Sequence, residues 1–154
     1  MACLIDSDFV IPSLHIGRIN SMNLIKFIVN KVGVGCSLTI FSYSITDVWM
    51  RQLMNLRHQY HISKIIMVLD RDVIIRHREK LNQLQFVADE VHLADSHAKV
   101  YVCSSNDYSV AVMTSANATQ NYRNEGYYIT DKPEELEAIQ DDIRNILGGS
   151  YQII

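Results

Sequence analysis

The stretch HAKVYVCSSNDYSVAVMTSANATQNYRNE, residues 97–125, carries most of the information about fold and site. Two runs rich in β-branched and aromatic residues, 97–103 and 109–115, flank the turn-forming residues SSNDY. This order predicts two antiparallel strands joined as a hairpin. A loop over 104–108 would place position 97 opposite position 115.

Polar side chains gather on one side of this predicted hairpin. His97 and Lys99 are two residues apart, so on a strand they face the same way, about 6.6 Å apart in rise. In the predicted register, Ser115 and Asn117 lie beside His97. An imidazole, an ammonium and a carboxamide in one place suit a phosphodiester. The imidazole attacks phosphorus or donates a proton near neutral pH, and the other two groups stabilise the charge that develops on oxygen.

Two residues near the end of the stretch are further candidates. Glu125 begins the next predicted strand and is the nearest carboxylate in sequence that could fix the imidazole tautomer of His97. Arg123 lies between the segments that carry Asn117 and Glu125, which makes it a candidate contact for phosphate.

Outward from the hairpin, helical and strand-like patterns alternate. The predicted strands cover 37–44, 64–70, 90–94 and 125–130, and the predicted helices cover 20–32, 46–60, about 72–86 and 131–147. The crossovers are long enough for parallel, right-handed units. The predicted fold class is therefore α/β, a mixed, mostly parallel β-sheet flanked by helices, in a single domain over residues 1–154.

Composition limits the classes of protein and site. The net charge is −3 with a pI near 6.0, so overall charge does not point to nucleic acid. No apolar run approaches the ~20 residues of a membrane span, and the N-terminal MACLIDSDFVIPSLHIGR lacks the basic start of a signal peptide. Cys3, Cys36 and Cys103 form no CxxC pair, which predicts reduced thiols, no structural metal and a cytoplasmic location.

The central stretch resembles the active-site motif of the phospholipase D superfamily, HxK(x)4D followed by GSxN and a glutamate. His97-Ala98-Lys99 matches HxK, 114–117 (TSAN) is similar to GSxN, and Asn124-Glu125 is similar to the downstream glutamate. The resemblance spans about 30 residues, and the upstream strands SLTIFSYS and KIIMVLD are also similar to the family. Ser104 stands where the motif has Asp, with Asp107 later in the turn, and Thr114 stands in place of Gly.

The resemblance implies a metal-independent phosphodiesterase without a cofactor. His97 would form a phosphohistidine, Lys99 and Asn117 would bind phosphate with help from Ser115, and Glu125 would orient His97. Family members use two such motifs face to face, and this chain has one. The resemblance therefore implies a homodimer with a shared active site.

The substrate and the activity leave alternatives open. The small size is similar to that of endonucleases in the family, so nucleic acid is the expected substrate. Ser104 and the acidic pI favour an alternative, a catalytically weakened phospholipase D-like module that binds nucleic acid or a partner protein. A third hypothesis makes the chain one subunit or fragment of a larger assembly.

Other features have ordinary structural explanations. His58 and His61 lie near a predicted helix end, where cations are common, and a metal pair is the weaker hypothesis. The basic residues of 71–80 predict a solvated helix face, with nucleic-acid contact as the alternative. Most of four tyrosines are predicted to lie in the core or at an interface rather than to stack on bases: Tyr101, Tyr122, Tyr127 and Tyr128.

Overall fold

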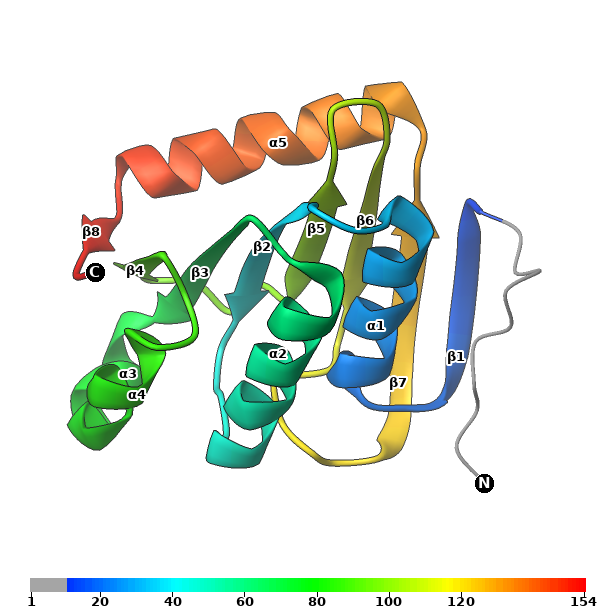
Figure 1. The fold of residues 1–154 in the computed structure, drawn as a ribbon. Helices are drawn as coiled ribbons and strands as arrows, with labels where there is room; N and C mark the ends of the chain where they lie inside the picture. Colours follow the sequence, from blue (N-terminus) through cyan, green and yellow to red (C-terminus); the bar gives the residue numbers. More distant parts are fainter. Residues whose placement is uncertain (1–10) are drawn as a thin grey trace.

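A computed structural model describes residues 11–154, which form a single sheet with helices on both faces (Figure 1). Cys3 and most of the N-terminal stretch MACLIDSDFVIPSLHIGR lie outside the described residues. The strands are β1 (Ser13–Ile19), β2 (Ser37–Ser42), β3 (Lys64–Asp70), β4 (Glu90–Ala94), β5 (Val100–Ser104), β6 (Ser109–Thr114), β7 (Arg123–Thr130) and β8 (Tyr151–Gln152). The helices are α1 (Ser21–Val32), α2 (Asp47–Tyr60), α3 (Arg71–Arg76), α4 (Leu81–Leu84) and α5 (Pro133–Gly148), with a 3₁₀ turn at Arg78–Lys80.

The sheet is mixed and mostly antiparallel, which corrects the predicted, mostly parallel sheet. Its order among the described residues is β1-β7-β6-β5-β2-β3-β4-β8. Only β2–β3 and β3–β4 are parallel pairs, the two that the helical crossovers predict. The hairpin of β5 and β6, the return through β7 and the unpredicted edge strands β1 and β8 all add antiparallel pairs.

The sequence pattern accounts for most of the individual elements. Asn20 caps α1 by accepting a hydrogen bond from the Asn23 amide, and Gly33 ends this helix at a φ of 99° that favours glycine. The predicted helix over 72–86 is interrupted instead. Its chain leaves helical geometry at His77 (φ −127°, ψ 53°), so α3, the 3₁₀ turn and α4 follow one another.

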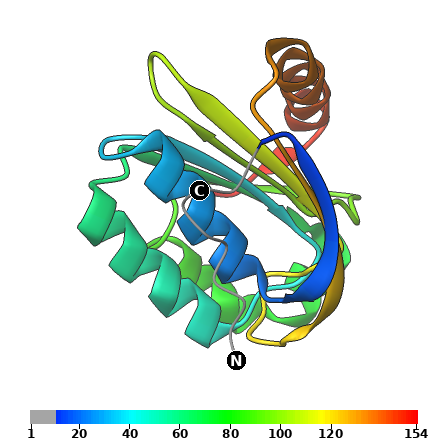
Figure 2. The same ribbon diagram turned by 90° about the vertical axis from the view of Figure 1, so that its right-hand side faces the viewer.

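Two layers of helices enclose the sheet. Figure 2 shows α1 and α2 on one face and α5 on the opposite face. The main core lies between the sheet and α1 and α2, and includes Ile28, Ile40 and Trp49, all fully buried. A smaller cluster of Val102, Ala111 and Leu136 joins α5 to the other face. Within residues 11–154, no helix has the length and apolar character needed to cross a bilayer.

The core also contains two cysteines and one buried polar pair. Cys36 and Cys103 are free and fully buried. The indole N–H of buried Trp49 donates to the hydroxyl of Ser21 over 2.8 Å, which satisfies a polar group between α1 and α2.

We expect Ser21→Ala to lower the free energy of unfolding by about 1–3 kcal/mol, because it leaves the buried indole N–H of Trp49 without its acceptor. Urea unfolding of Ser21→Ala in the wild-type and Trp49→Phe backgrounds measures the coupling. The substitution should cost clearly less in the Trp49→Phe background, where no donor remains. Equal costs in both backgrounds would rule out the hydrogen bond as the cause.

Candidate active site

The candidate residues lie at one edge of the sheet, the lower edge in Figure 1, where β2 and β6 end and β5 and β7 begin. His97 and Lys99 immediately precede β5, Ser115 and Asn117 follow β6, and Glu125 lies in β7. A hollow of about 420 Å³ opens at this edge, lined by His97, Ala98, Lys99, Val100, Met113, Thr114 and Ser115. Three of the predicted residues, His97, Lys99 and Ser115, therefore face one space.

His97 and Lys99 are in direct contact. The ammonium nitrogen Nζ of Lys99 lies 2.8 Å from Nδ1 of the His97 imidazole and donates to the His97 carbonyl oxygen over 2.8 Å. Lys99 is only 7% exposed, whereas His97 is exposed to solvent. Burial lowers the pKa of Lys99, because desolvation disfavours the charged ammonium, and the carboxylate of Glu125 acts in the opposite direction.

Tyr43 is a site residue that the sequence analysis missed. Its ring centroid lies 4.5 Å from that of His97, and Nζ of Lys99 lies 5.6 Å from the Tyr43 centroid, over the ring face. Tyr43 comes directly after β2, the strand paired with β5. The order of strands in the sheet supplied this neighbour, and no spacing in the sequence indicates it. A cation over an aromatic face is stabilised by the ring quadrupole.

Ser115 and Glu125 form a second contact. The Ser115 hydroxyl donates to the Glu125 carboxylate and accepts a hydrogen bond from the Gly126 amide over 3.1 Å. Glu125 thus has a fixed position at the start of β7 and acts on Lys99 through its charge. The predicted orienting role of Glu125, in which its carboxylate would accept a hydrogen bond from the His97 imidazole, stays a prediction.

Asn117 lies in a loop that is anchored at several points. The amide of Ala118 donates to the Ser42 hydroxyl over 2.9 Å, and buried Tyr101 donates to the Ala116 carbonyl over 2.9 Å. Within the described residues, Oδ1 of Asn117 is buried without a hydrogen-bond partner. Oδ1 is an acceptor, so a hydrogen-bond donor such as an ordered water would satisfy it.

The hairpin register differs by one residue from the prediction. Ser104 pairs with Ser109, so the loop covers four residues, 105–108, and Lys99 lies beside Thr114. The Ser109 hydroxyl donates to that of Ser104 over 2.9 Å, which gives the residue in place of the motif Asp a structural role at the hairpin end. The polar groups still converge, because His97, Lys99 and Ser115 lie just outside the regular strands.

Thr114, in place of the motif glycine, also has a structural role. Its hydroxyl donates to the Gly126 carbonyl over 3.0 Å and accepts from the Ala116 amide over 3.1 Å. These two bonds tie the end of β6 to β7 and start the turn toward Asn117. The departure from the motif is therefore accommodated by local hydrogen bonding.

The remaining candidates take varied positions. Arg123 is exposed at the start of β7, beside Ile19 of β1. His58 and His61 lie at the C-terminal end of α2, as predicted. Across residues 11–154, no three His, Cys, Asp or Glu side chains are grouped closely enough to hold a metal ion.

The four tyrosines of the sequence analysis have different environments. Tyr101 and Tyr127 are buried in the core, as predicted. Tyr128 is half-buried and donates to Glu135 of α5. Tyr122, in the loop before β7, is 41% exposed, so it is available to a ligand at this edge.

Comparisons with solved structures agree with the fold. The chain is similar to the phospholipase D family member Nuc from Salmonella typhimurium, with a TM-score of 0.64 and 14% identity over 92% of this chain and 98% of that one. It is also similar to phosphatidylserine synthase from Haemophilus influenzae (TM-score 0.54, 13% identity, 96% of this chain and 42% of that one).

A third similar structure is TrmBL2, an archaeal chromatin protein that binds DNA, with a TM-score of 0.57 and 10% identity over 97% of this chain and 58% of that one. No protein-family model matches the sequence, and no curated protein does. The phospholipase D-like fold predicted from the motif is confirmed by the structural similarity.

We expect Glu125→Gln to lower the pKa of Lys99 further, because the Glu125 carboxylate raises that pKa by stabilising the ammonium. NMR of the Lys99 side chain, titrated with pH, measures the shift. Glu90→Gln is the matched control, since Glu90 pairs with Lys64. A Lys99 pKa that is unchanged or higher in Glu125→Gln would contradict this electrostatic arrangement.

Proposed function

We propose that this chain is a metal-independent phosphodiesterase of the phospholipase D superfamily that cleaves nucleic acid through a phosphohistidine on His97. The observation that carries the proposal is the contact between His97 and the buried ammonium of Lys99, at a hollow that Ser115 also lines. A desolvated cation beside a nucleophile stabilises the negative charge that builds up on phosphate oxygens more strongly than one in water.

Each group has a role in the reaction. An unprotonated nitrogen of the His97 imidazole attacks phosphorus, the new P–N bond forms, and the P–O bond to the leaving group breaks. Lys99 and the amide of Asn117 bind the non-bridging oxygens. Water then attacks phosphorus and gives its proton to the group that protonated the leaving oxygen, the P–N bond breaks, and the imidazole is regenerated. Ser115 holds Glu125, whose charge favours the ammonium form of Lys99.

The first step requires a second proton-transfer group. Attack and departure at phosphorus are roughly in line, so a group that protonates the leaving oxygen lies on the side opposite the nucleophile. One imidazole cannot occupy both sides at once. We therefore assign the general acid to His97 of the partner subunit in a homodimer with twofold symmetry.

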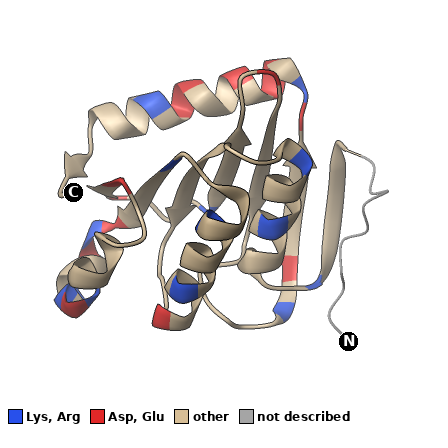
Figure 3. Ribbon diagram, viewed as in Figure 1, with Lys and Arg blue, Asp and Glu red and all other residues tan. Residues whose placement is uncertain are grey.

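Charge distribution around the site supports a nucleic-acid substrate. Arg123 is exposed at the start of β7, at the same end of the strands as the site, where it would contact a phosphate flanking the scissile one. Exposed Tyr122 precedes Arg123 and offers a ring on which a base stacks. Five acidic residues lie on α5, at the opposite end of the hairpin strands (Figure 3), although Glu125 lies at the site itself. The DNA-binding structure TrmBL2 shares the fold.

We expect His97→Ala to abolish cleavage of labelled single- and double-stranded DNA and of RNA in EDTA, while the exposed control His58→Ala retains wild-type rates. Circular dichroism checks that both variants are folded. Full activity in His97→Ala would overturn the assignment. Binding of the probes without cleavage by the wild type would favour the alternative, a phospholipase D-like binding module.

We expect Tyr43→Ala to lower kcat by about tenfold, since a cation–π contact is worth about 1–2 kcal/mol when partly desolvated and each 1.4 kcal/mol corresponds to a factor of ten. Tyr43→Phe keeps the ring that faces His97 and Lys99 and should retain most activity. Single-turnover rates with saturating substrate measure both. Equal losses in the two variants would assign the effect to the hydroxyl instead of the ring.

A further inference from the structure

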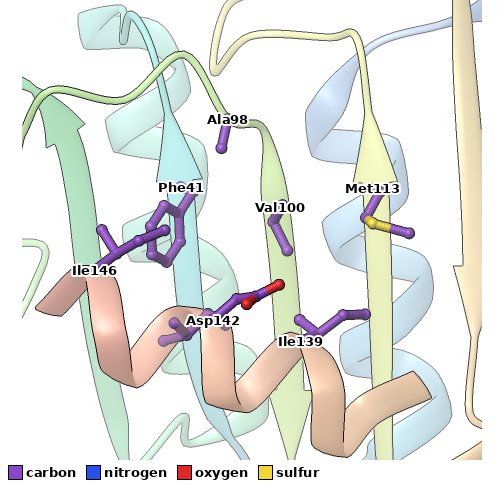
Figure 4. A pocket seen from close by; sticks show the side chains of 8 residues that line it. Phe41, Ala98, Val100, Met113, Ile139, Asp142 and Ile146 are labelled. Atoms are coloured by element: carbon purple, nitrogen blue, oxygen red, sulfur yellow. The ribbon is translucent and has the colours of Figure 1, made fainter. Parts of the chain in front are cut away.

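An apolar cavity lies between α5 and the sheet, on the face opposite to α1 and α2. Its walls are apolar side chains of the strands and of α5, among them Val100, Met113 and Ile139, and Asp142 is the one charged group in its lining. Figure 4 shows Asp142 pointing from α5 into the space between the helix and Val100. The cavity holds about 170 Å³, well below the ~300–1,000 Å³ of sites for drug-sized ligands, so it suits a single ring system.

This cavity is continuous with the candidate active site. Ala98, Val100 and Met113 line both the cavity and the hollow around His97 and Lys99. The hollow lies at the end of the sheet where β5 begins, so it gives access to both faces. By contrast, the hollow between α2 and α4 shares no lining residue with it. A substituent of a phosphate bound at Lys99 therefore has direct access to the cavity beneath α5.

Asp142 is free to accept hydrogen bonds from a ligand. Within residues 11–154 its carboxylate has no hydrogen bond and no ion pair, whereas the carboxylate of its neighbour Asp141 pairs with Arg144. A carboxylate has two oxygens and accepts hydrogen bonds without donating any. The ligand group that suits this cavity therefore has apolar faces and a donor-bearing edge.

We propose that the cavity binds the base of a nucleotide attached to the scissile phosphate, and that Asp142 makes it prefer guanine. The inference rests on the proposed function and specifies which base its substrate carries. The faces of a base pack well between apolar side chains such as Val100 and Met113. The five acidic residues of α5 disfavour a further phosphate at this helix, so the sugar–phosphate chain stays at the hollow and the neutral base enters the cavity.

The preference for guanine follows from the hydrogen-bonding edges of the bases. Guanine has two donors side by side, N1–H and N2–H, which match the two oxygens of one carboxylate. Adenine and cytosine each place one donor beside a ring-nitrogen acceptor, and the acceptor would face a carboxylate oxygen. Thymine and uracil flank one N–H with two carbonyl oxygens. A carboxylate therefore favours guanine over the other bases, and it also disfavours an alkyl chain in the cavity.

Mapping the cleavage positions on single-stranded DNA of randomised sequence, in EDTA, measures the base preference. We expect cuts beside guanine at least about tenfold more often than beside any other base, because a good bidentate pair discriminates between bases by about that factor or more. Asp142→Asn keeps the size of the side chain but offers one donor and one acceptor. It should shift the preference from guanine toward adenine or cytosine.

Asp141→Asn is the matched control, because Asp141 is the adjacent acidic residue of α5 and pairs with Arg144. It should keep the guanine preference, and circular dichroism verifies that both variants are folded. A wild type that cleaves all bases equally, or an Asp142→Asn variant that still prefers guanine, would overturn the proposal.

Direct binding tests the cavity without turnover. Met113 is 40% exposed, so NMR of its methyl group reports on a ligand there. Guanosine, adenosine, cytidine and uridine monophosphates share the phosphate and differ in the base. We expect the guanine nucleotide to shift the Met113 methyl signal at the lowest concentration, and Asp142→Asn to remove this advantage. A shift caused by a short-chain phosphatidylcholine but by none of the nucleotides would identify a site for apolar chains and overturn the proposal.

The two experiments separate this inference from the proposed function. A wild type that binds the guanine nucleotide preferentially but cleaves nothing supports the base pocket and contradicts the phosphodiesterase. A wild type that cleaves DNA with no base preference and binds the four nucleotides equally supports the phosphodiesterase and contradicts the base pocket.

Discussion

The site depends on one interaction, the contact between the buried ammonium of Lys99 and the exposed imidazole of His97. A lysine that is 7% exposed loses most of its hydration, and the fold must compensate for that loss. It does so with a carbonyl oxygen and an imidazole nitrogen at 2.8 Å, the ring face of Tyr43 and the charge of Glu125. A phosphate oxygen would enter the same environment, which suits a charge that grows during reaction.

The rest of the structure holds these groups in place. The segments that carry these residues lie at one end of the sheet, where adjacent antiparallel strands begin and end. Ser42 and Tyr101 anchor the loop that bears Asn117, and Thr114 ties the end of β6 to β7. Side chains that are fixed by packing and by second contacts are oriented before a ligand arrives, which reduces the cost of organising a site.

The sequence predicted the main strands, the hairpin and the family of folds, because each rests on local periodicity or on a motif of fixed spacing. It failed where several segments decide together. β1 was missed because its apolar residues Leu14 and Ile16 face outward, and it exists only by pairing with β7. The sheet is mostly antiparallel because of β1, β8 and the hairpin. The register of β5 and β6 differs by one residue because the hairpin loop is one residue shorter than predicted. The sequence did not indicate Tyr43 as a site residue, because its ring contacts His97, which is 54 positions later in the chain.

A covalent bond between the His97 imidazole and phosphorus distinguishes the proposed mechanism from direct attack by water, and this bond can be trapped. The protein is mixed with an oligonucleotide that carries a labelled phosphodiester, the reaction is stopped by denaturation under alkaline conditions that preserve a phosphoramidate, and the peptides are analysed by mass spectrometry. We expect a phosphorus-containing adduct on the peptide that holds His97, at its imidazole. Cleavage that proceeds with no adduct, or with the adduct on a different residue, would contradict it.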